Sequence, residues 1–306
     1  MNRVDILLGT YNGAPFLSEQ IDSILGQSYT EWKLLIRDDG STDKTKEIVR
    51  RYRDRYPDRI IVREDGFGNL GAAMNFSKLL EYSSAPYVMF CDQDDLWLPD
   101  KIASTLKKMR ELENQTSNTP LLVHTDLKVV DIHLDPIDDS YWSYQGLNPD
   151  YCTLNRLLVQ NVITGCTVMI NRPLVELSAD IPGDAIMHDW WIGLIAAAFG
   201  RIEALPVATV QYRQHSGNDT GADAFGLATI AEKALSLFSF SFGKYTRQAH
   251  AFLERFGEKL ESGQKEMLEA FVAIDRESWP RGKATLLRYH IFKQRWTRNM
   301  GLLLCR

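Results

Sequence analysis

The chain has 306 residues, 44% of them hydrophobic, and a formal net charge of −5. This length allows one large domain or two smaller ones with a sizeable buried core. The acidic balance argues against a nucleic-acid partner, because general nucleic-acid binding favours a basic surface. No apolar stretch reaches the roughly 18 residues that a membrane-spanning helix needs, and the amino terminus lacks a signal-peptide pattern. We therefore expect a cytoplasmic protein that is soluble or, at most, peripheral on the inner face of the membrane.

The first part of the chain alternates between short apolar runs and helical patterns. Strands are predicted at residues 4–8, 33–36, 59–63 and 87–91, and helices at 15–27, 42–55, 70–82 and 99–113. Four successive strand–helix units are typical of an α/β fold with a doubly wound, mainly parallel sheet. Helices are expected on both faces of that sheet.

The pattern loosens after Pro120. Further strands are predicted at residues 121–124, 127–130, within 162–170 and at 207–212, and a helix at 187–199. Residues 131–150 are polar and rich in turns, yet they include Tyr141, Trp142 and Tyr144. Such aromatic side chains either bind the face of a sugar or pack beneath the sheet.

The last part of the chain is almost continuously helix-forming. We therefore divide the chain into a main domain at residues 1–222 and a carboxyl-terminal helical region at 223–306. Residues 281–306 contain seven Lys or Arg and no acidic residue, with apolar side chains between them. That composition suits an amphipathic helix on an anionic membrane surface. Alternatively, this segment is a basic helix that packs against the acidic main domain.

A cluster of carboxylates follows the apolar run at residues 87–91. Asp92, Asp94 and Asp95 stand where the predicted strand ends, and ligands of open α/β sheets bind at such strand ends. Neighbouring carboxylates repel one another unless a cation offsets the repulsion. The cluster therefore predicts a hard divalent cation, Mg²⁺ or Mn²⁺, that carries a phosphate. A solvated, Asp-rich turn is the alternative.

Polar residues also follow the first two predicted strands. Thr10, Tyr11 and Asn12 come after the first strand and can contact a base or ribose, although Asn12-Gly13 is also a simple turn signal. Asp39 comes after the second strand and can accept a hydrogen bond from the imide N–H of a pyrimidine. Residues 41 and 43 could cap the next helix without it.

Three weaker candidates lie elsewhere. Asn69 and Gly71 belong to a glycine-containing turn at a helix start, which can admit an anionic group. Asp189 lies beside aromatic residues and suits a general base, because partial burial raises a carboxyl pKa; helix capping would also explain it. His215 follows the last predicted strand and is either a metal ligand or structural.

Taken in order, these segments resemble the family 2 glycosyltransferases, which have the GT-A fold. The resemblance covers roughly the first 220 residues. Within that family the chain is similar to bacterial rhamnosyltransferases that use dTDP-rhamnose in cell-surface polysaccharide assembly. The stretches that carry this likeness are residues 35–40, 92–99, 187–190 and 212–215.

The resemblance implies a role for each candidate. Asp39 would hold the pyrimidine N3–H in a pocket lined by Thr10, Tyr11 and Asn12, with Asn69 and Gly71 nearby. Asp92 would contact the ribose or the water shell of the metal. Asp94 would ligate Mg²⁺ or Mn²⁺, His215 would be a further ligand of the metal or diphosphate, and Asp189 would be the catalytic base.

The implied reaction is an inverting transfer from a dTDP- or UDP-sugar to a hydroxyl of a glycan or lipid-linked glycan. Two rivals remain open. A haloacid-dehalogenase-type phosphohydrolase also has an apolar strand ending in Asp-x-Asp, but its motif stands on the first strand, and Asp39 would have no task in it. A non-catalytic sugar-nucleotide-binding protein on the same fold would not need Asp189 as a base.

Overall fold

A computed structural model of the chain describes residues 3–215 and 242–304. Its centre is a nine-stranded sheet in the order β3-β2-β1-β4-β8-β6-β9-β5, with β7 paired to β6. The first four strands are parallel and agree closely with the predicted ones: β1 Val4–Thr10, β2 Trp32–Asp38, β3 Ile60–Val62 and β4 Tyr87–Cys91. The mainly parallel α/β sheet is therefore confirmed.

Each of the first four strands is followed by a predicted helix. These are α1 Leu17–Leu25, α2 Thr45–Arg55, α3 Ala72–Tyr82 and α4 Lys101–Glu113. Their starts lie two or three residues later than predicted, because the preceding polar residues form the strand-end loops. Asp43, for example, accepts a hydrogen bond from the Thr45 N–H at 3.0 Å, just before α2.

The second half of the sheet departs further from prediction. Strand β6 (Leu121–Val130) is continuous where two strands were expected, and its register against β9 (Arg201–Arg213) shifts around Asp126. A polar Thr-Asp pair fits inside it because Thr125 Oγ1 lies 2.6 Å from Thr209 Oγ1 and Asp126 accepts the Trp142 N–H. The other strands are β5 Leu96–Trp97, β7 Pro136–Asp138 and β8 Met169–Asn171.

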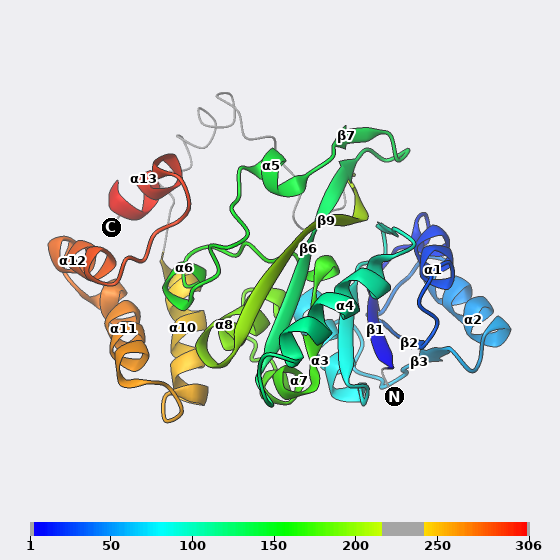
Figure 1. Cartoon of the computed structure of the whole chain (residues 1–306), viewed down its shortest axis with the longest axis horizontal. Coiled ribbons are helices and arrows are strands. Elements are labelled where there is room, and N and C mark those ends of the chain that lie inside the picture. Colours follow the sequence, from blue (N-terminus) through cyan, green and yellow to red (C-terminus); the bar gives the residue numbers. More distant parts are fainter. Residues whose placement is uncertain (1–2, 216–241, 305–306) are drawn as a thin grey trace.

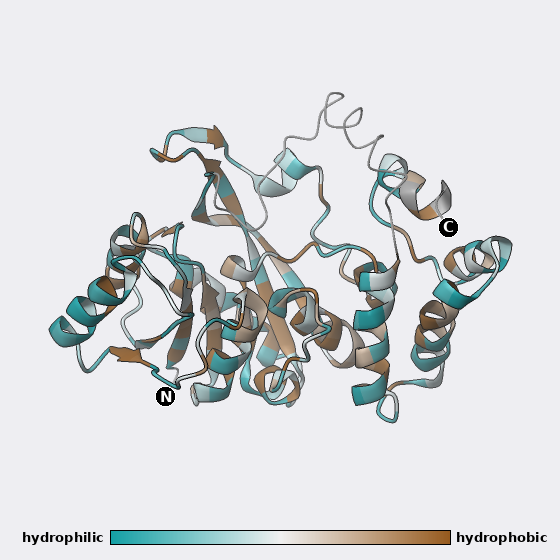
Figure 2. Ribbon diagram, turned by 180° about the vertical axis from the view of Figure 1, so that it is seen from behind, coloured by the Kyte–Doolittle hydropathy of each residue, from teal (hydrophilic) through white to brown (hydrophobic). Residues whose placement is uncertain are grey.

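Shorter helices connect these strands, and α8 (His188–Phe199) follows them as predicted. The connecting helices are α5 Tyr141–Gln145, α6 Leu154–Leu157, η1 Gly165–Thr167 and α7 Arg172–Ser178. Hydrophobic residues concentrate in the strands and in α8, whereas the outer helices are largely polar (Figure 2). Strands β6 and β9 end near α5, at the upper edge of the molecule in Figure 1.

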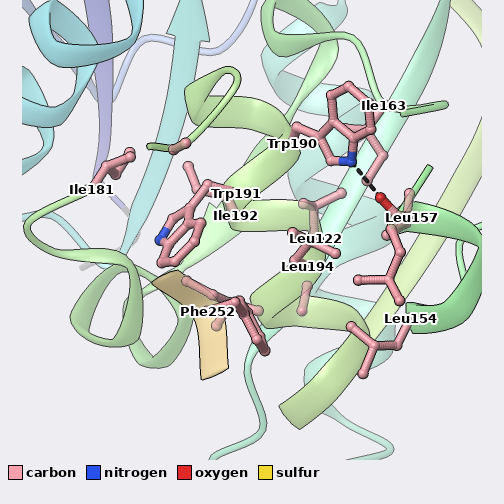
Figure 3. Close-up of a cluster of buried hydrophobic side chains, with 14 of the residues drawn as sticks. Leu122, Leu154, Leu157, Ile163, Ile181, Trp190, Trp191, Ile192, Leu194 and Phe252 are labelled. Atoms are coloured by element: carbon pink, nitrogen blue, oxygen red, sulfur yellow. Dashed lines mark hydrogen bonds between the residues drawn. The ribbon is translucent and has the colours of Figure 1, made fainter. Parts of the chain in front are cut away.

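The described carboxyl-terminal helices lie at the end of the molecule opposite α1 and α2 (Figure 1). They are α10 Gly243–Phe256, α11 Ser262–Ala273, η3 Ile274–Arg276, α12 Trp279–Arg288 and α13 Trp296–Leu304. Figure 3 shows Phe252 of α10 beside Trp191 of α8, and the ring centroids are 5.5 Å apart. Helix α10 thus shares a core with the main domain. The predicted boundary at residue 222 lies outside the described residues.

The predicted basic helix at the end of the chain is divided. Residues 289–295 separate α12 from α13, and this segment is held against residues 146–160 by several hydrogen bonds. Among the helices of residues 3–215 and 242–304, none has the length and apolar character needed to cross a membrane.

Candidate functional site

The candidate residues come together where the parallel strands end. Thr10 at the end of β1 is paired with Asp38 of β2, and Leu8 is paired with Cys91 of β4. The loops that follow these strands therefore lie side by side, as expected for the carboxyl edge of a parallel sheet. Gln93 joins two of them, because its side-chain amide makes two 2.9 Å hydrogen bonds with the backbone of Tyr11.

Asp94 and His215 meet in this structure. The Oδ2 atom of Asp94 lies 2.9 Å from Nε2 of His215, and the two side chains are 16% and 13% exposed. The His215 ring is stacked on Phe16 at 4.7 Å between centroids. The carboxylate comes from the β4 loop and the imidazole follows β9, so the fold brings together two residues that are far apart in the sequence.

Arg213 holds this pair in place. Its Nε donates to the Asp94 carbonyl oxygen at 3.0 Å, and the guanidinium lies 4.8 Å from the centre of the Phe16 ring. Glu19 of α1 forms an ion pair with the same guanidinium. The sequence interpretation gave no role to Arg213, Phe16 or Glu19, because their contacts depend on α1 and β9 being neighbours in space.

Asp95 differs sharply from Asp94. It is fully buried, and its Oδ1 accepts the Arg213 N–H at 3.3 Å. Burial, followed by the charges of Asp94 and Asp92, raises the pKa of Asp95 well above its usual value. A raised pKa favours the neutral form of the carboxyl group, and the buried Asp95 supports the loop.

Two groups of side chains could hold a cation here. Ligand atoms of Asp92, Asp95 and Cys166 lie within 4.8 Å of one another, but burial raises the pKa of Cys166 and of Asp95, which disfavours the charged forms that a cation needs. Mg²⁺ and Mn²⁺ prefer ionised carboxylates and keep positions open for water and phosphate. The partly exposed Asp94 and His215, with Asp92 beside them in sequence, fit that requirement better.

Both carboxylate oxygens of Asp39 accept hydrogen bonds from within the protein. Its Oδ1 accepts from Arg37 at 2.7 Å and from the Leu70 N–H at 2.9 Å, and its Oδ2 accepts the Gly71 N–H at 2.8 Å. Each carboxylate oxygen can accept two hydrogen bonds, so Oδ2 can also accept from a base. Asp39 therefore fixes the loop that contains Asn69, and its role as a base reader stays a prediction.

A buried arginine sits behind Asp39. Arg37 is 1% exposed; it contacts Asp65 at 2.7 and 3.1 Å and the Asn75 side-chain oxygen at 3.0 Å. Charge-assisted, bidentate contacts of this kind are strong and directional. The hydrogen bonds and charges of Asp65 and Asp39 raise the pKa of Arg37 despite the opposing effect of burial. Arg37 thus offsets part of the negative charge of Asp39 and Asp65.

Thr10, the last residue of β1, and the two residues after it have different environments. Thr10 is buried, and its hydroxyl donates to Asp38 at 3.1 Å. Asn12 has a φ of 48°, and its side-chain oxygen accepts the Thr42 N–H at 2.9 Å. The Tyr11 side chain is 48% exposed. Thr10 and Asn12 therefore shape the wall of the predicted nucleotide pocket, while Tyr11 offers a ring for stacking.

Asp189 lies in the first turn of α8 and is buried. Burial raises its pKa to about 6, although hydrogen bonds from the Trp190 and Gly165 N–H groups and the Asn161 side chain oppose this. Helix capping does not account for it, because Met187 holds the N-cap position. A carboxylate with a pKa near 6 is suited to accept a proton near neutral pH.

The short helix η1 connects Asp189 to the acidic segment. Gly165 donates its N–H to Asp189, and the next residue, Cys166, lies beside Asp92 and Asp95. A Cβ atom at Gly165 would lie 3.0 Å from Nε2 of His188, so a larger residue would require the His188 ring to shift. His188 packs against Phe76 at 4.0 Å, and burial lowers its pKa to about 3. His188 is therefore a neutral packing residue.

Comparisons with known proteins identify the family and the fold of the chain. The sequence model described as "Glycosyl transferase family 2" matches residues 5–174. Relatives include the putative teichuronic acid biosynthesis glycosyltransferase TuaG of Bacillus subtilis, 31% identical over 55% of this chain and 62% of TuaG. The dTDP-rhamnosyl transferase RfbG of Shigella flexneri is 28% identical over 71% of this chain and 74% of its own. The match with TuaG thus spans less than two thirds of that relative's length.

Solved structures show the same fold. TarS of S. aureus in complex with UDP-GlcNAc has a TM-score of 0.55 and 16% identity, over 94% of this chain and 89% of the TarS chain. The mannosyltransferase PcManGT of Pyrobaculum calidifontis, with GDP-Man and Mn²⁺, has a TM-score of 0.54 and 18% identity, over 98% and 78%. The GT-A fold is therefore confirmed. With more than half of its residues matched by the family model, the chain belongs to glycosyl transferase family 2.

Proposed function

We propose that this chain is an inverting, metal-dependent glycosyltransferase. It transfers a sugar from a nucleotide diphosphate to a hydroxyl of a cell-surface polysaccharide or lipid-linked glycan. The observation that carries the proposal is the Asp94–His215 pair at the same sheet edge as Asp189, whose pKa is raised to about 6. Partly exposed metal-binding groups beside a buried base suit metal-assisted group transfer.

Asp94, His215 and Asp92 would hold Mg²⁺ or Mn²⁺. When bound, the cation stabilises the negative charge that grows on the leaving diphosphate. Asp39 accepts the imide N–H of the base through Oδ2, while Arg37 and the Leu70 and Gly71 N–H groups keep its carboxylate oriented. Asp189 accepts the proton of the acceptor hydroxyl as its oxygen attacks the anomeric carbon in a single displacement.

L-Rhamnose from dTDP-rhamnose is the donor that we propose, on the basis of the likeness to RfbG. Another relative, WfgD of Escherichia coli, is named as a UDP-Glc-dependent glucosyltransferase acting on a diphosphoundecaprenol-linked GlcNAc. It supports a lipid-linked acceptor and leaves a UDP-sugar as the competing donor. Thymine and uracil present the same imide N–H to Asp39, so that contact alone does not separate the two donors.

A thermal-unfolding screen of nucleotide sugars with Mn²⁺ tests the donor. A ligand that binds the folded state raises Tm, and the rise grows with the ratio of ligand concentration to Kd. We expect dTDP-rhamnose to stabilise the chain more than UDP-glucose, UDP-GlcNAc or GDP-mannose. Equal stabilisation by all four would contradict rhamnose as the donor, and no stabilisation by any would contradict a sugar-nucleotide site.

A non-catalytic sugar-nucleotide-binding protein is the alternative. The environment of Asp189 argues against a purely binding role. Burying a carboxyl group costs stability, and its pKa of about 6 lies in the range where a general base is useful. Metal-dependent cleavage of the donor separates the two functions: the enzyme releases a nucleoside diphosphate, whereas a binding protein leaves the donor intact.

We further propose peripheral contact with an anionic membrane through the basic end of the chain, residues 281–306. Three large apolar side chains of α12 and α13 are exposed: Trp279 at 46%, Leu287 at 59% and Trp296 at 76%. Basic residues surround them in the sequence. Exposed Trp and Leu next to Lys and Arg suit insertion at a lipid–water interface.

A further inference from the structure

The segment that joins α6 to η1, residues 157–165, lies against the start of α8. The indole N–H of Trp190 donates to the Leu157 carbonyl oxygen at 2.5 Å (Figure 3). At the other end of the segment, a Cβ atom at Gly165 would lie 3.5 Å from Cβ of Asp189. The segment therefore follows the turn of the helix that carries the proposed base.

Asn161 lies in the middle of this segment, and its amide group has a fixed orientation. Its Oδ1 accepts the Ile163 N–H at 3.0 Å, and its Nδ2 donates to the Ile163 carbonyl oxygen at 2.8 Å. Turning the amide over would break both hydrogen bonds. Ile163 is itself seated on α8, because a Cβ atom at Gly193 would lie 2.7 Å from its Cδ1 atom. Nδ2 has two hydrogens, so it can serve a second acceptor.

That second acceptor is the carboxylate of Asp189. Hydrogen bonds to Asp189 come from the Trp190 N–H, the Gly165 N–H and the Asn161 side chain. The first of these measures 2.6 Å. The two backbone donors do not depend on which residue occupies their positions, whereas the third requires an amide side chain at position 161. Asn161 is therefore the donor that a substitution can remove.

The donors matter because Asp189 is only 8% exposed. Burial favours the neutral carboxyl group, and hydrogen bonds to the carboxylate oppose that effect. Titratable groups nearby are His188 in α8, Cys166 in η1 and Tyr245 in α10, whose ring packs 5.8 Å from that of Trp190. Burial lowers the pKa of His188 to about 3 and raises the pKa of Cys166 and of Tyr245. Each of these groups therefore favours its neutral form near neutral pH.

Charged side chains on other elements around α8 have their own partners. These contacts are Lys78 with Glu81, Arg156 with the Phe292 carbonyl oxygen, Arg172 with the Ala85 carbonyl oxygen, Arg201 with Glu203, and Arg247 with Asp184. The local hydrogen bonds are therefore the contacts that favour the ionised form of Asp189.

We propose that Asn161 is a positioning residue for Asp189: its amide holds the carboxylate in one orientation and stabilises the ionised form. The inference rests on the proposed function, in which Asp189 is the general base. In that reaction the proton of the acceptor hydroxyl passes to the Asp189 carboxylate, and the hydroxyl oxygen bonds to the anomeric carbon as the bond to the diphosphate breaks. Asn161 donates a hydrogen bond throughout and gives up no proton.

The pH profile of transfer tests this role. Asn161→Leu removes the donor with little change in side-chain size, and Asn161→Ala removes it without any risk of a clash. In both variants we expect the midpoint of the profile to move upward by about one pH unit, because the ionised carboxylate loses one hydrogen bond. A midpoint unchanged in both variants, with the rate lowered equally at every pH, would overturn the proposal in favour of a structural role.

A matched control separates this effect from damage to a turn. The side-chain oxygen of Asn148 accepts the Asp150 N–H at 3.0 Å, two residues further along the chain, as that of Asn161 does with Ile163. Asn148→Ala removes the same kind of turn contact. It should leave the midpoint of the pH profile at its wild-type value. An equal shift in Asn148→Ala would overturn the proposal.

Unfolding measurements report on Asp189 without any transfer. Because burial raises its pKa from 3.8 to about 6, the folded chain binds this proton more tightly than the unfolded chain. Asp189 therefore lowers stability as the pH rises through this range, and its contribution levels off above the folded pKa. Urea unfolding of wild type and Asp189→Asn at a series of pH values isolates that contribution.

Repeating this pair of measurements in the Asn161→Ala background completes the test. We expect the decline in stability caused by Asp189 to continue about one pH unit higher than in the wild-type background. The same decline in both backgrounds would overturn the inference even if the chain transfers sugar. A shifted decline in a chain that transfers no sugar would support the contact between Asn161 and Asp189 and contradict the proposed function alone.

Discussion

Two regions of the molecule are constructed differently. On the nucleotide side, Asp39 is held by Arg37 and by two backbone N–H groups from the loop before α3, and all of these belong to the repeated strand–helix units. At the other end of the molecule, residues 289–295 come from the far end of the chain and are hydrogen-bonded to residues 146–160.

This difference shows that the strand–helix units contain a buried charged frame, whereas the far end of the chain is held by loop contacts. On the proposed nucleotide side, the buried Arg37 pairs with two carboxylates, so changes there should lower stability and donor binding together. Loops tolerate change better than strands, so changes at residues 289–295 should leave the proposed donor site intact.

The largest effect is expected at Asp189, the general base of the proposed reaction. Asp189→Asn preserves shape and the hydrogen bond from the Trp190 N–H but removes the proton acceptor. We expect transfer to fall by about 10²–10⁴-fold, the usual contribution of a general base, while calorimetry shows unchanged nucleotide-sugar binding. Wild-type turnover in this variant would contradict the assignment.

Arg37 tests the claim that the nucleotide side is a buried charged frame. Arg37→Leu leaves Asp39 and Asp65 without their guanidinium partner, and breaking a buried ion pair costs about 3–5 kcal/mol of unfolding free energy. Urea unfolding measures this loss. Arg53→Leu is the control, because Arg53 pairs with the exposed Asp54 and should change stability by about 1 kcal/mol or less. Equal effects would contradict the account.

Asp94 tests the proposed metal site. We expect Asp94→Ala to reduce Mn²⁺-dependent nucleotide binding at least tenfold, about 1.4 kcal/mol, because the cation loses its charged ligand. Calorimetry with Mn²⁺ and with a chelator measures the difference. Asp58→Ala, a surface change in the turn before β3, is the control. Affinity that stays the same with and without Mn²⁺ in wild type would rule out the metal site.

The pH profile gives a smaller and independent test. Because burial raises the pKa of Asp189 to about 6, the base is ionised above this pH and protonated below it. Transfer at saturating donor should therefore fall with decreasing pH through about 6, approaching tenfold per unit. The residual activity of Asp189→Asn should not fall in this way as the pH decreases. A wild-type rate that stays flat between pH 5 and 7 would argue against Asp189 as the base.

The smallest effect is expected at the exposed end of the chain. Trp296→Ser removes a large apolar side chain that is 76% exposed, and we expect binding to anionic vesicles to weaken roughly tenfold. Co-sedimentation measures it. Tyr11→Ser, which removes an exposed ring at the other end of the molecule, serves as the control. Loss of vesicle binding in Tyr11→Ser alone would contradict membrane contact through residues 281–306.

The predictable part of the fold is the part made by local patterns. Strand β4 has the predicted bounds, and the four strand–helix units appear in the predicted order, because apolar periodicity is a short-range signal. The continuity of β6 was missed because Thr125 and Asp126 interrupt its apolar pattern. Their partners, Thr209 and Ser140, become neighbours only after folding.

The candidate site was also predictable only where the signal is local in the sequence. Their positions at strand ends made Asp94 and His215 candidate metal ligands, and the resemblance strengthened that prediction, but the contacts of Arg213 with Phe16 and Glu19 have no signal in the sequence. Asp94 is partly exposed and Asp95 is buried. The sequence does not reveal this difference, because the two residues are adjacent and identical.

The most direct test of the central claim is release of nucleoside diphosphate from a nucleotide sugar by the full chain with Mn²⁺, measured together with glycoside formation. The account predicts that both products appear in equal amounts, that a chelator stops both, and that Asp189→Asn loses transfer while it still binds the donor. Transfer that persists with the chelator, or an Asp189→Asn variant as active as wild type, would contradict it.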